Sequence, residues 1–297
     1  MQGETKPAGI QNKEANMLVN SITAKKILTD MKGDSTVGFT HSLNPYSGCA
    51  FGCRYCYVRE MPIQRYSDTP WGEWVSIKTN AADKYRSETV NLRRRNKSIN
   101  LFMSTATDPY QPLERKTELT RSILEEMVKH PPDFLQIQTR SPLVVRDLNL
   151  LLELNQKCEV LVSMTIETDR EDMKRLFAPH APGIKLRLQA LKEVNNAGIA
   201  TQASISPVLP FTPDFPKTLE TIVDRIYIDT LNIGDGTRGK RSERLGMPFL
   251  FKENELSGWY QMDIHLRVEK YFKRFFPEEM IFISSDKVYP LKGKVSK

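Results

Sequence analysis

Short apolar runs alternate, from about residue 37 to residue 235, with longer segments in which apolar side chains recur every three or four positions. The short runs predict strands, and the three-to-four-residue period predicts helices that each bury one face. Predicted strands lie at 37–40, 99–104, 134–139, 160–166, 199–206 and 226–233. Predicted helices lie at 79–96, 118–129 (with Thr117 as N-cap), 146–155, 184–196 and 215–224. This alternation predicts an α/β domain of about six β/α units around a parallel sheet.

The segments on either side differ in character. Residues 1–36 are mostly polar, and we interpret them as an N-terminal arm. Residues 235–250 are rich in Gly, Arg and Lys and are predicted to form a loop, and 259–276 has the pattern of an amphipathic helix. We therefore predict an arm at 1–36, the α/β domain at 37–235 and a C-terminal extension at 236–297.

Composition adds limits on the class of protein. The chain has 297 residues, 39% hydrophobic and 27% charged, which is typical of a water-soluble globular protein. No apolar run is long enough to span a membrane, and the N-terminal residues contain no apolar signal segment, so a cytoplasmic location is expected. The net charge of +7 permits an anionic partner such as nucleic acid, with an ordinary solvated surface as the alternative.

The cysteines carry the most specific signal. Cys49, Cys53 and Cys56 fall within eight residues, in the segment GCAFGCRYCY, whereas Cys158 is about a hundred residues away. Three thiolates on one short loop can bind one metal centre. A structural zinc site needs four protein ligands, and only His41 or Cys158 could complete it. A [4Fe–4S] cluster held by three thiolates would leave one iron open to an exogenous ligand. Buried inert thiols are the third alternative.

The C-x3-C-x2-C spacing, with Tyr55 as the aromatic residue before the last cysteine, resembles the radical S-adenosylmethionine (radical SAM) superfamily. The resemblance implies that Cys49, Cys53 and Cys56 bind a [4Fe–4S] cluster. It also implies that the open iron binds S-adenosylmethionine (SAM), whose reductive cleavage gives a 5′-deoxyadenosyl radical for hydrogen abstraction. The implied fold is a partial (β/α)6 TIM-like barrel with the cluster loop after the first strand, which agrees with the alternation above.

Further segments are similar to the spore-photoproduct-lyase-like branch of that superfamily. They are Asn44-Pro45-Tyr46, Ser104-Thr105-Ala106-Thr107-Asp108-Pro109-Tyr110-Gln111-Pro112, Arg187-Leu188, Ala197-Gly198-Ile199 and Ser206-Pro207-Val208-Leu209-Pro210. The likeness runs from about residue 37 to residue 235.

The branch suggests which strand-end residues contact SAM. Thr107 and Asp108 would accept hydrogen bonds from its amine, with a turn role as the alternative, and Arg140 would bind its carboxylate. Ser163 and Thr165 share one face of a predicted strand and would bind the ribose, and Glu167 continues that face. Tyr55, Val208 and the segment 207–210 are candidates for the adenine.

The substrate is less well specified. The branch's DNA-repair lyases place a cysteine hydrogen donor immediately before the Ser/Thr-Asp pair, but here that position is Ala106. Cys158 precedes a predicted strand, at the end of the barrel opposite the site. DNA or a nucleotide is therefore one candidate substrate, supported by the basic runs 93–97 and 238–244, and a peptide or small molecule is the other. The resemblance also implies an electron donor of the flavodoxin or ferredoxin type.

A non-catalytic metal-binding protein is the alternative to an enzyme. Cys49, Cys53 and Cys56 could hold zinc or an electron-transfer cluster in a binding protein. The iron content and the ability to cleave SAM distinguish these possibilities.

Overall fold

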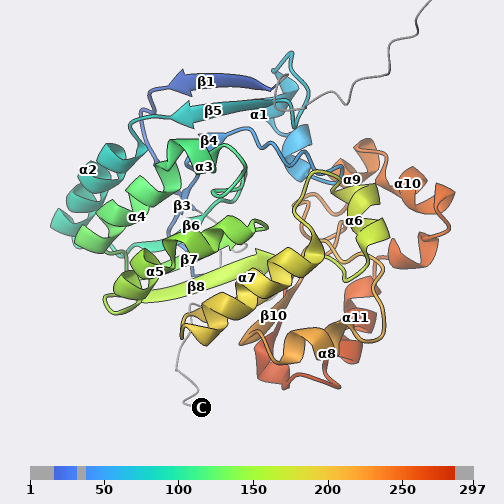
Figure 1. Ribbon diagram of the computed structural model, residues 1–297. Helices are drawn as coiled ribbons and strands as arrows, with labels where there is room; N and C mark the ends of the chain where they lie inside the picture. The colour runs from blue at the N-terminus through green and yellow to red at the C-terminus, as the bar shows by residue number, and fades with distance from the viewer. Residues whose placement is uncertain (1–16, 32–37, 285–297) are drawn as a thin grey trace, which may run out of the picture.

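The computed structural model describes residues 17–31 and 38–284, which form two sheets and the helices around them (Figure 1). The larger sheet has the strand order β11-β10-β9-β8-β7-β6-β3-β2. Its strands are β2 (Leu28–Asp30), β3 (His41–Leu43), β6 (Asn100–Met103), β7 (Phe134–Thr139), β8 (Glu159–Thr165), β9 (Ala200–Ile205), β10 (Arg225–Ile228) and β11 (Ile281–Ile283). Strands β3 to β11 run parallel, and β2 pairs antiparallel with β3. The smaller sheet has the order β1-β5-β4, with β1 (Leu18–Ile22), β5 (Trp74–Lys78) and β4 (Tyr46–Ser47).

Helices lie along the outside of the curved larger sheet (Figure 1). The helices of the described residues are α1 (Pro62–Arg65), α2 (Ala81–Arg94), α3 (Glu114–Thr117), α4 (Leu119–Lys129), α5 (Leu148–Asn155), α6 (Glu171–Phe177), α7 (Ile184–Asn196), α8 (Phe215–Glu220), α9 (Lys240–Arg244), α10 (Met247–Glu253) and α11 (Ile264–Phe272). Short 3-10 turns occupy Tyr57–Glu60, Pro142–Asp147, Ser257–Trp259 and Glu278–Met280. None of the helices in the described ranges has the length and apolar content that would cross a bilayer.

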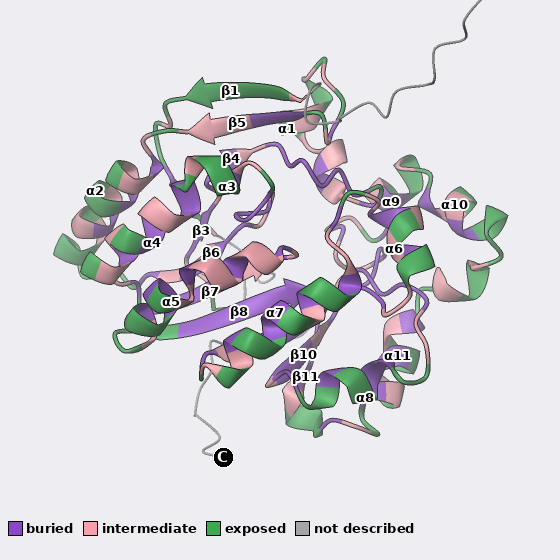
Figure 2. Cartoon of the chain, viewed as in Figure 1, coloured by how far each residue is buried: buried purple, intermediate pink, exposed green. Residues whose placement is uncertain are grey.

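The hydrophobic core lies between the strands and these helices. Strand β8 is buried along nearly its whole length, whereas α7 is exposed on its outer face (Figure 2). Side chains alternate across each strand, so Leu135 and Ile137 of β7 pack outward against helices while Gln136 and Gln138 face the interior of the barrel. An interior lined by amides and hydroxyls is suited to a polar ligand rather than to a dry core.

The predicted α/β fold class is confirmed, and several elements agree closely with their predicted ranges. Strand β7 and helix α7 have the predicted bounds, and β6, β8 and β9 differ by one residue at each end. The first barrel strand is His41–Leu43 rather than 37–40, and β10 ends at Ile228 rather than at 233.

Other predicted elements were wrong. Thr117 is the last residue of α3 and not an N-cap, because Glu118, with φ +48°, separates α3 from α4. The predicted loop at 235–250 contains α9 and the first residues of α10, and each of these helices is preceded by a glycine of positive φ. The predicted helix at 259–276 is limited to α11, because the chain at 257–259 forms a 3-10 turn.

The flanking segments also contribute strands. β1 and β2 lie within residues 17–31, and β11 extends the parallel sheet from the C-terminal segment. Residues 1–16 of the predicted arm lie outside the described residues. The proposed domain boundaries remain a prediction.

Candidate active site

The cysteine loop follows β4, and two glycines allow its tight path. Gly48 has φ +81°, and a Cβ there would lie 2.4 Å from the Trp74 carbonyl oxygen. Gly52 has φ +53° and packs against Gly72, whose Cα would lie 3.1 Å from an added Cβ. A larger residue at either position would displace the backbone that carries the cysteines.

Hydrogen bonds from elsewhere in the chain fix the loop. The Arg59 guanidinium donates to the carbonyl oxygens of Cys53 (2.9 Å) and Gly52 (2.8 Å). The Ala50 amide donates to Gln111 Oε1 at 2.9 Å, and the Thr107 hydroxyl donates to the Gly48 carbonyl at 2.6 Å. The loop is therefore held in place by contacts independent of any metal.

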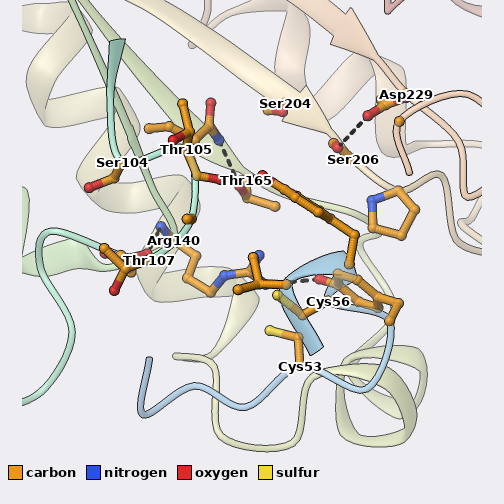
Figure 3. Close-up of a pocket in the computed structure, with 18 of the residues that line it drawn as sticks. Cys53, Cys56, Ser104, Thr105, Thr107, Arg140, Thr165, Ser204, Ser206 and Asp229 are labelled. Atoms are coloured by element: carbon orange, nitrogen blue, oxygen red, sulfur yellow. Dashed lines mark hydrogen bonds between the residues drawn. The ribbon is translucent and has the colours of Figure 1, made fainter. Parts of the chain in front are cut away.

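Cys49, Cys53 and Cys56 line one cavity, and Figure 3 shows Cys53 and Cys56 along one side of it. Burial raises the pKa of all three thiols, that of Cys56 to about 11, because a thiolate here loses its hydration. A bound metal centre supplies the positive charge that stabilises three such thiolates.

The described residues contain no preformed site for a single metal ion. Within 17–31 and 38–284, no three His, Cys, Asp or Glu side chains are grouped to hold one metal ion. Thiolates on a cubane each bind a different iron and so stand farther apart than ligands of one ion. His41, a candidate fourth ligand, interacts with Asp30 (3.3 Å) and Thr40 (2.8 Å) instead. Cys158 lies before β8, at the opposite ends of the strands.

The cavity has a volume of about 370 Å³ and lies at the carboxyl ends of the parallel strands. Open α/β sheets and barrels bind their ligands at this edge. Beyond the cysteines, its polar lining includes Ser104, Thr105, Thr107, Asp108, Gln136, Gln138, Thr139, Arg140, Thr165, Gln202, Ser204, Ser206, Tyr227, Asp229, Thr230, Asp235, Ser242 and Ser284 (Figure 3).

A buried network orients Arg140 at the end of β7. Its Nη1 donates to Glu167 Oε1 (2.6 Å) and to the Tyr55 hydroxyl (2.9 Å), and that hydroxyl donates to Glu167. Arg187 donates to the other Glu167 oxygen at 2.7 Å. Burial by itself would raise the pKa of Glu167, but the two guanidinium groups outweigh it and lower this pKa to about 2. Glu167 is therefore ionised, and the Nε and Nη2 groups of Arg140 take no part in these bonds.

Asp108 is nearly enclosed by protein donors. One carboxylate oxygen accepts from the Tyr110 amide (2.9 Å) and the Thr139 hydroxyl (2.7 Å), and the other accepts from the Arg140 amide (2.8 Å). Burial raises the pKa of Asp108, although these bonds oppose it. An ionised carboxylate has about four acceptor positions, so three bonds leave about one toward the cavity. Asp108 thus links the ends of β6 and β7 beside the cavity.

The remaining predicted residues divide into two groups. Tyr55, Thr107 and Thr165 line the cavity with Asp108 and Arg140, whereas Ser163 and Val208 are not part of its lining. Ser163 is fully buried and accepts from Gln202 at 2.7 Å. The roles of all these residues toward SAM remain predictions.

Sequence reasoning missed part of the lining. Ser204, Ser206 and Asp229 at the ends of β9 and β10 face the cavity. Alternation along β9 would have placed Ser204 and Ser206 on the inward face with Gln202. Asp229 was not predicted as a site residue because the predicted strand 226–233 continued past it, so it was not recognised as a strand-end residue.

The family model for the radical SAM superfamily matches residues 43–222, which is more than half of the chain. A protein of Methanocaldococcus jannaschii of unknown function is 33% identical over 189 residues, covering 64% of this chain and 67% of that protein. A protein of Acidianus two-tailed virus, also uncharacterized, is 30% identical over 264 residues, covering 85% of this chain and 81% of that protein.

Among solved structures, spore photoproduct lyase complexed with dinucleoside spore photoproduct is similar over 95% of this chain and 87% of that chain. The TM-score is 0.61 at 13% sequence identity, so this likeness concerns the fold alone. The chain belongs to the radical SAM superfamily, whose members use a [4Fe–4S] cluster and S-adenosylmethionine.

Proposed function

We propose that this protein is an enzyme that cleaves SAM reductively and abstracts a hydrogen atom from a nucleotide or nucleic-acid substrate. The observation that carries the chemistry is the meeting of Cys49, Cys53 and Cys56 with polar strand-end side chains in one cavity. When bound, the cluster and SAM supply a 5′-deoxyadenosyl radical, which takes a hydrogen atom and leaves as 5′-deoxyadenosine. The electron comes from an external reductant, for which a flavodoxin or ferredoxin is the proposed partner.

The residues around the cavity bind and orient the cofactor in this proposal. Arg140 offers its unused Nε and Nη2 hydrogens to the SAM carboxylate, while Glu167 and Tyr55 hold the guanidinium in place. Thr107 and the remaining acceptor position of Asp108 face the amine. Thr165 is assigned to the ribose and Tyr55 to the adenine side. Ser163 and Val208 lie outside the cavity lining, and Ser163 accepts a hydrogen bond from Gln202 within the sheet.

The test begins with protein purified and reconstituted without oxygen. We expect about four iron atoms per chain, the electron paramagnetic resonance signal of a reduced cubane, and 5′-deoxyadenosine when dithionite and SAM are added. A colourless protein that binds zinc would overturn the proposal. A brown protein that never cleaves SAM would indicate an electron-transfer role instead.

The charge at the cavity mouth supports a nucleic-acid substrate. The loop and helix at 235–244 contribute Asp235 and Ser242 to the cavity lining. Arg238 and Lys240 of this segment are exposed, whereas Arg244 pairs with Glu60 at 2.6 Å. Basic side chains at the rim can bind phosphates while a base enters the cavity. Ala106 occupies the position of the cysteine donor of the repair lyases. We therefore propose hydrogen abstraction and not photoproduct repair.

Deuterium transfer tests the substrate class. Oligodeoxynucleotides deuterated on the sugars and on the thymine methyl groups, both undamaged and irradiated, are incubated with reduced enzyme and SAM. Deuterium in the 5′-deoxyadenosine would support the proposal. Its absence with every DNA, together with continued SAM cleavage, would exclude DNA and leave the radical chemistry intact.

A further inference from the structure

The carboxylate of Asp229 lies in the cavity wall on the side away from the cysteine loop. Figure 3 shows Asp229 bonded to Ser206, well separated from Cys53 and Cys56. Asp229 follows β10, Ser206 follows β9 and Ser284 follows β11, so three neighbouring strand ends bring them together.

The hydrogen bonds of this cluster leave only acceptors toward the cavity. The Thr230 amide donates to one Asp229 oxygen at 2.8 Å, and the Ser206 hydroxyl donates to the other at 3.1 Å. The Ser284 hydroxyl also bonds this carboxylate. Because both hydroxyl hydrogens are used on Asp229, Ser206 and Ser284 offer oxygen lone pairs to a ligand, as does the carboxylate itself.

The Asp229 carboxylate has no cationic partner in the described part of the chain. Glu167 is paired with two arginines, whereas no Lys, Arg or His among the described residues pairs with Asp229. Burial and, to a smaller extent, the charge of Asp235 raise the pKa of Asp229 to about 6. Asp229 is partly buried, and a carboxylate that has lost part of its hydration without gaining a counter-ion carries a desolvation cost. The strand ends that its hydrogen bonds connect already pair through their backbones, since β10 lies between β9 and β11.

The backbone nearby is shaped around the same carboxylate. A Cβ on Gly234 would lie 1.9 Å from Asp229 Oδ2, so a side chain at 234 would displace the carboxylate. Glycine at this position therefore keeps Asp229 facing the cavity.

We propose that Asp229, with the hydroxyl oxygens of Ser206 and Ser284, binds a nitrogen group of the substrate that donates two or more N–H hydrogen bonds. Two sources offer this chemistry: the amino edge of a nucleobase, and a protonated amine or guanidinium. The inference rests on the proposed function only in taking the cavity as the substrate site.

The experiment measures binding to cluster-loaded protein with SAM present and no reductant, so it does not depend on radical chemistry. One set of probes compares deoxycytidine and deoxyguanosine, which carry amino groups, with thymidine, which does not. The other compares methylguanidinium with the neutral N-methylurea. We expect the amino-bearing or cationic probe of one set to bind. Asp229→Asn should lower the affinity for that probe about tenfold or more, because the variant loses roughly one charge-assisted hydrogen bond.

Asp214→Asn, which removes an exposed acid with no side-chain hydrogen bond in the described residues, is the matched control and should bind each probe as the wild type does. Equal probe affinity in Asp229→Asn and wild type, or no probe binding at all, would overturn the inference. So would a selective loss of SAM affinity in Asp229→Asn, since this would place the carboxylate against the cofactor. Failure of the wild type to cleave SAM would instead overturn the proposed function.

Discussion

Glu167 and Arg187 form an ion pair of 2.7 Å in which both side chains are almost completely buried. The pair also sets the position of Arg140, because the second Glu167 oxygen accepts from that guanidinium. Arg187 belongs to α7 and Arg140 to the end of β7, so one carboxylate connects an outer helix to the cavity.

Glu167→Gln should destabilise the protein and weaken SAM binding together. Removing the charge leaves Arg187 buried without an ionised partner, which lowers the free energy of unfolding by about 3–5 kcal/mol. Arg140 also loses the carboxylate that orients its guanidinium. Urea unfolding and equilibrium dialysis with SAM measure the two effects. Glu159→Gln, at the exposed start of β8, is the control. Unchanged SAM affinity in a folded Glu167→Gln protein would contradict the proposed role of Arg140.

Cys53→Ala and Cys158→Ala should behave in opposite ways. The first removes a proposed cluster ligand, so bound iron and 5′-deoxyadenosine formation should be lost. The second removes a thiol that packs at the edge of the core away from the cavity, and iron content should stay as in the wild type. Iron analysis and visible absorption of reconstituted proteins provide the measurement. Full iron content in Cys53→Ala would refute the ligand assignment.

The pKa of Asp229 predicts a pH-dependent gain in stability for Asp229→Asn. A folded-state pKa of about 6, above the ordinary value of 3.8, means that the native state binds more protons than the unfolded chain between these values. Wild-type stability contributed by this group therefore falls as pH rises from about 4 to 6, by up to about 3 kcal/mol.

The variant avoids this loss. Its unfolding free energy relative to wild type should increase from pH 4.5 to pH 7.5, as urea titrations at several pH values can measure. A difference that is constant with pH would show that Asp229 titrates normally in the folded protein.

Two basic segments lie at opposite ends of the barrel and should differ in DNA binding. Arg238 and Lys240 are exposed at the cavity mouth, whereas Arg94 and Arg95 end α2, before β6 begins. We expect the double change of Arg238 and Lys240 to Glu to weaken DNA binding and to lower the salt dependence of the affinity. The same change at Arg94 and Arg95 should have little effect. Fluorescence anisotropy over a range of salt concentrations distinguishes the two, and equal losses would argue against the mouth as the binding surface.

The spacing of apolar and polar residues predicted the barrel elements well where strands and helices were long and regularly patterned. Helix α7 and strand β7 have the predicted bounds because each carries a clear hydrophobic period. Helix α7 ends at Asn196, two residues before Gly198, and β7 ends at Thr139. The short helices α9 and α10 were missed because their glycines and basic residues have the composition of a loop, and tertiary contacts stabilise such short helices.

The site was predictable only in part. The spacing of Cys49, Cys53 and Cys56 is a local signal, and it can be recognised from a single sequence. The pairing of Glu167 with Arg140 and Arg187, and of Asp229 with Ser206, joins residues 20 to 27 positions apart. Such contacts depend on which strands become neighbours, and single-strand patterns do not contain that information.

The last strand of the sheet sets the minimum length of a working fragment. The family match ends at residue 222, before β10, and β11 pairs with β10 through Ile281–Ile283. A protein truncated to the matched region would lack Asp229 and Ser284, so one side of the cavity would be missing. It would also expose the edge of β9, which β10 covers in the full sheet. Crystallisation or functional screens on this protein should therefore keep the chain at least through residue 284.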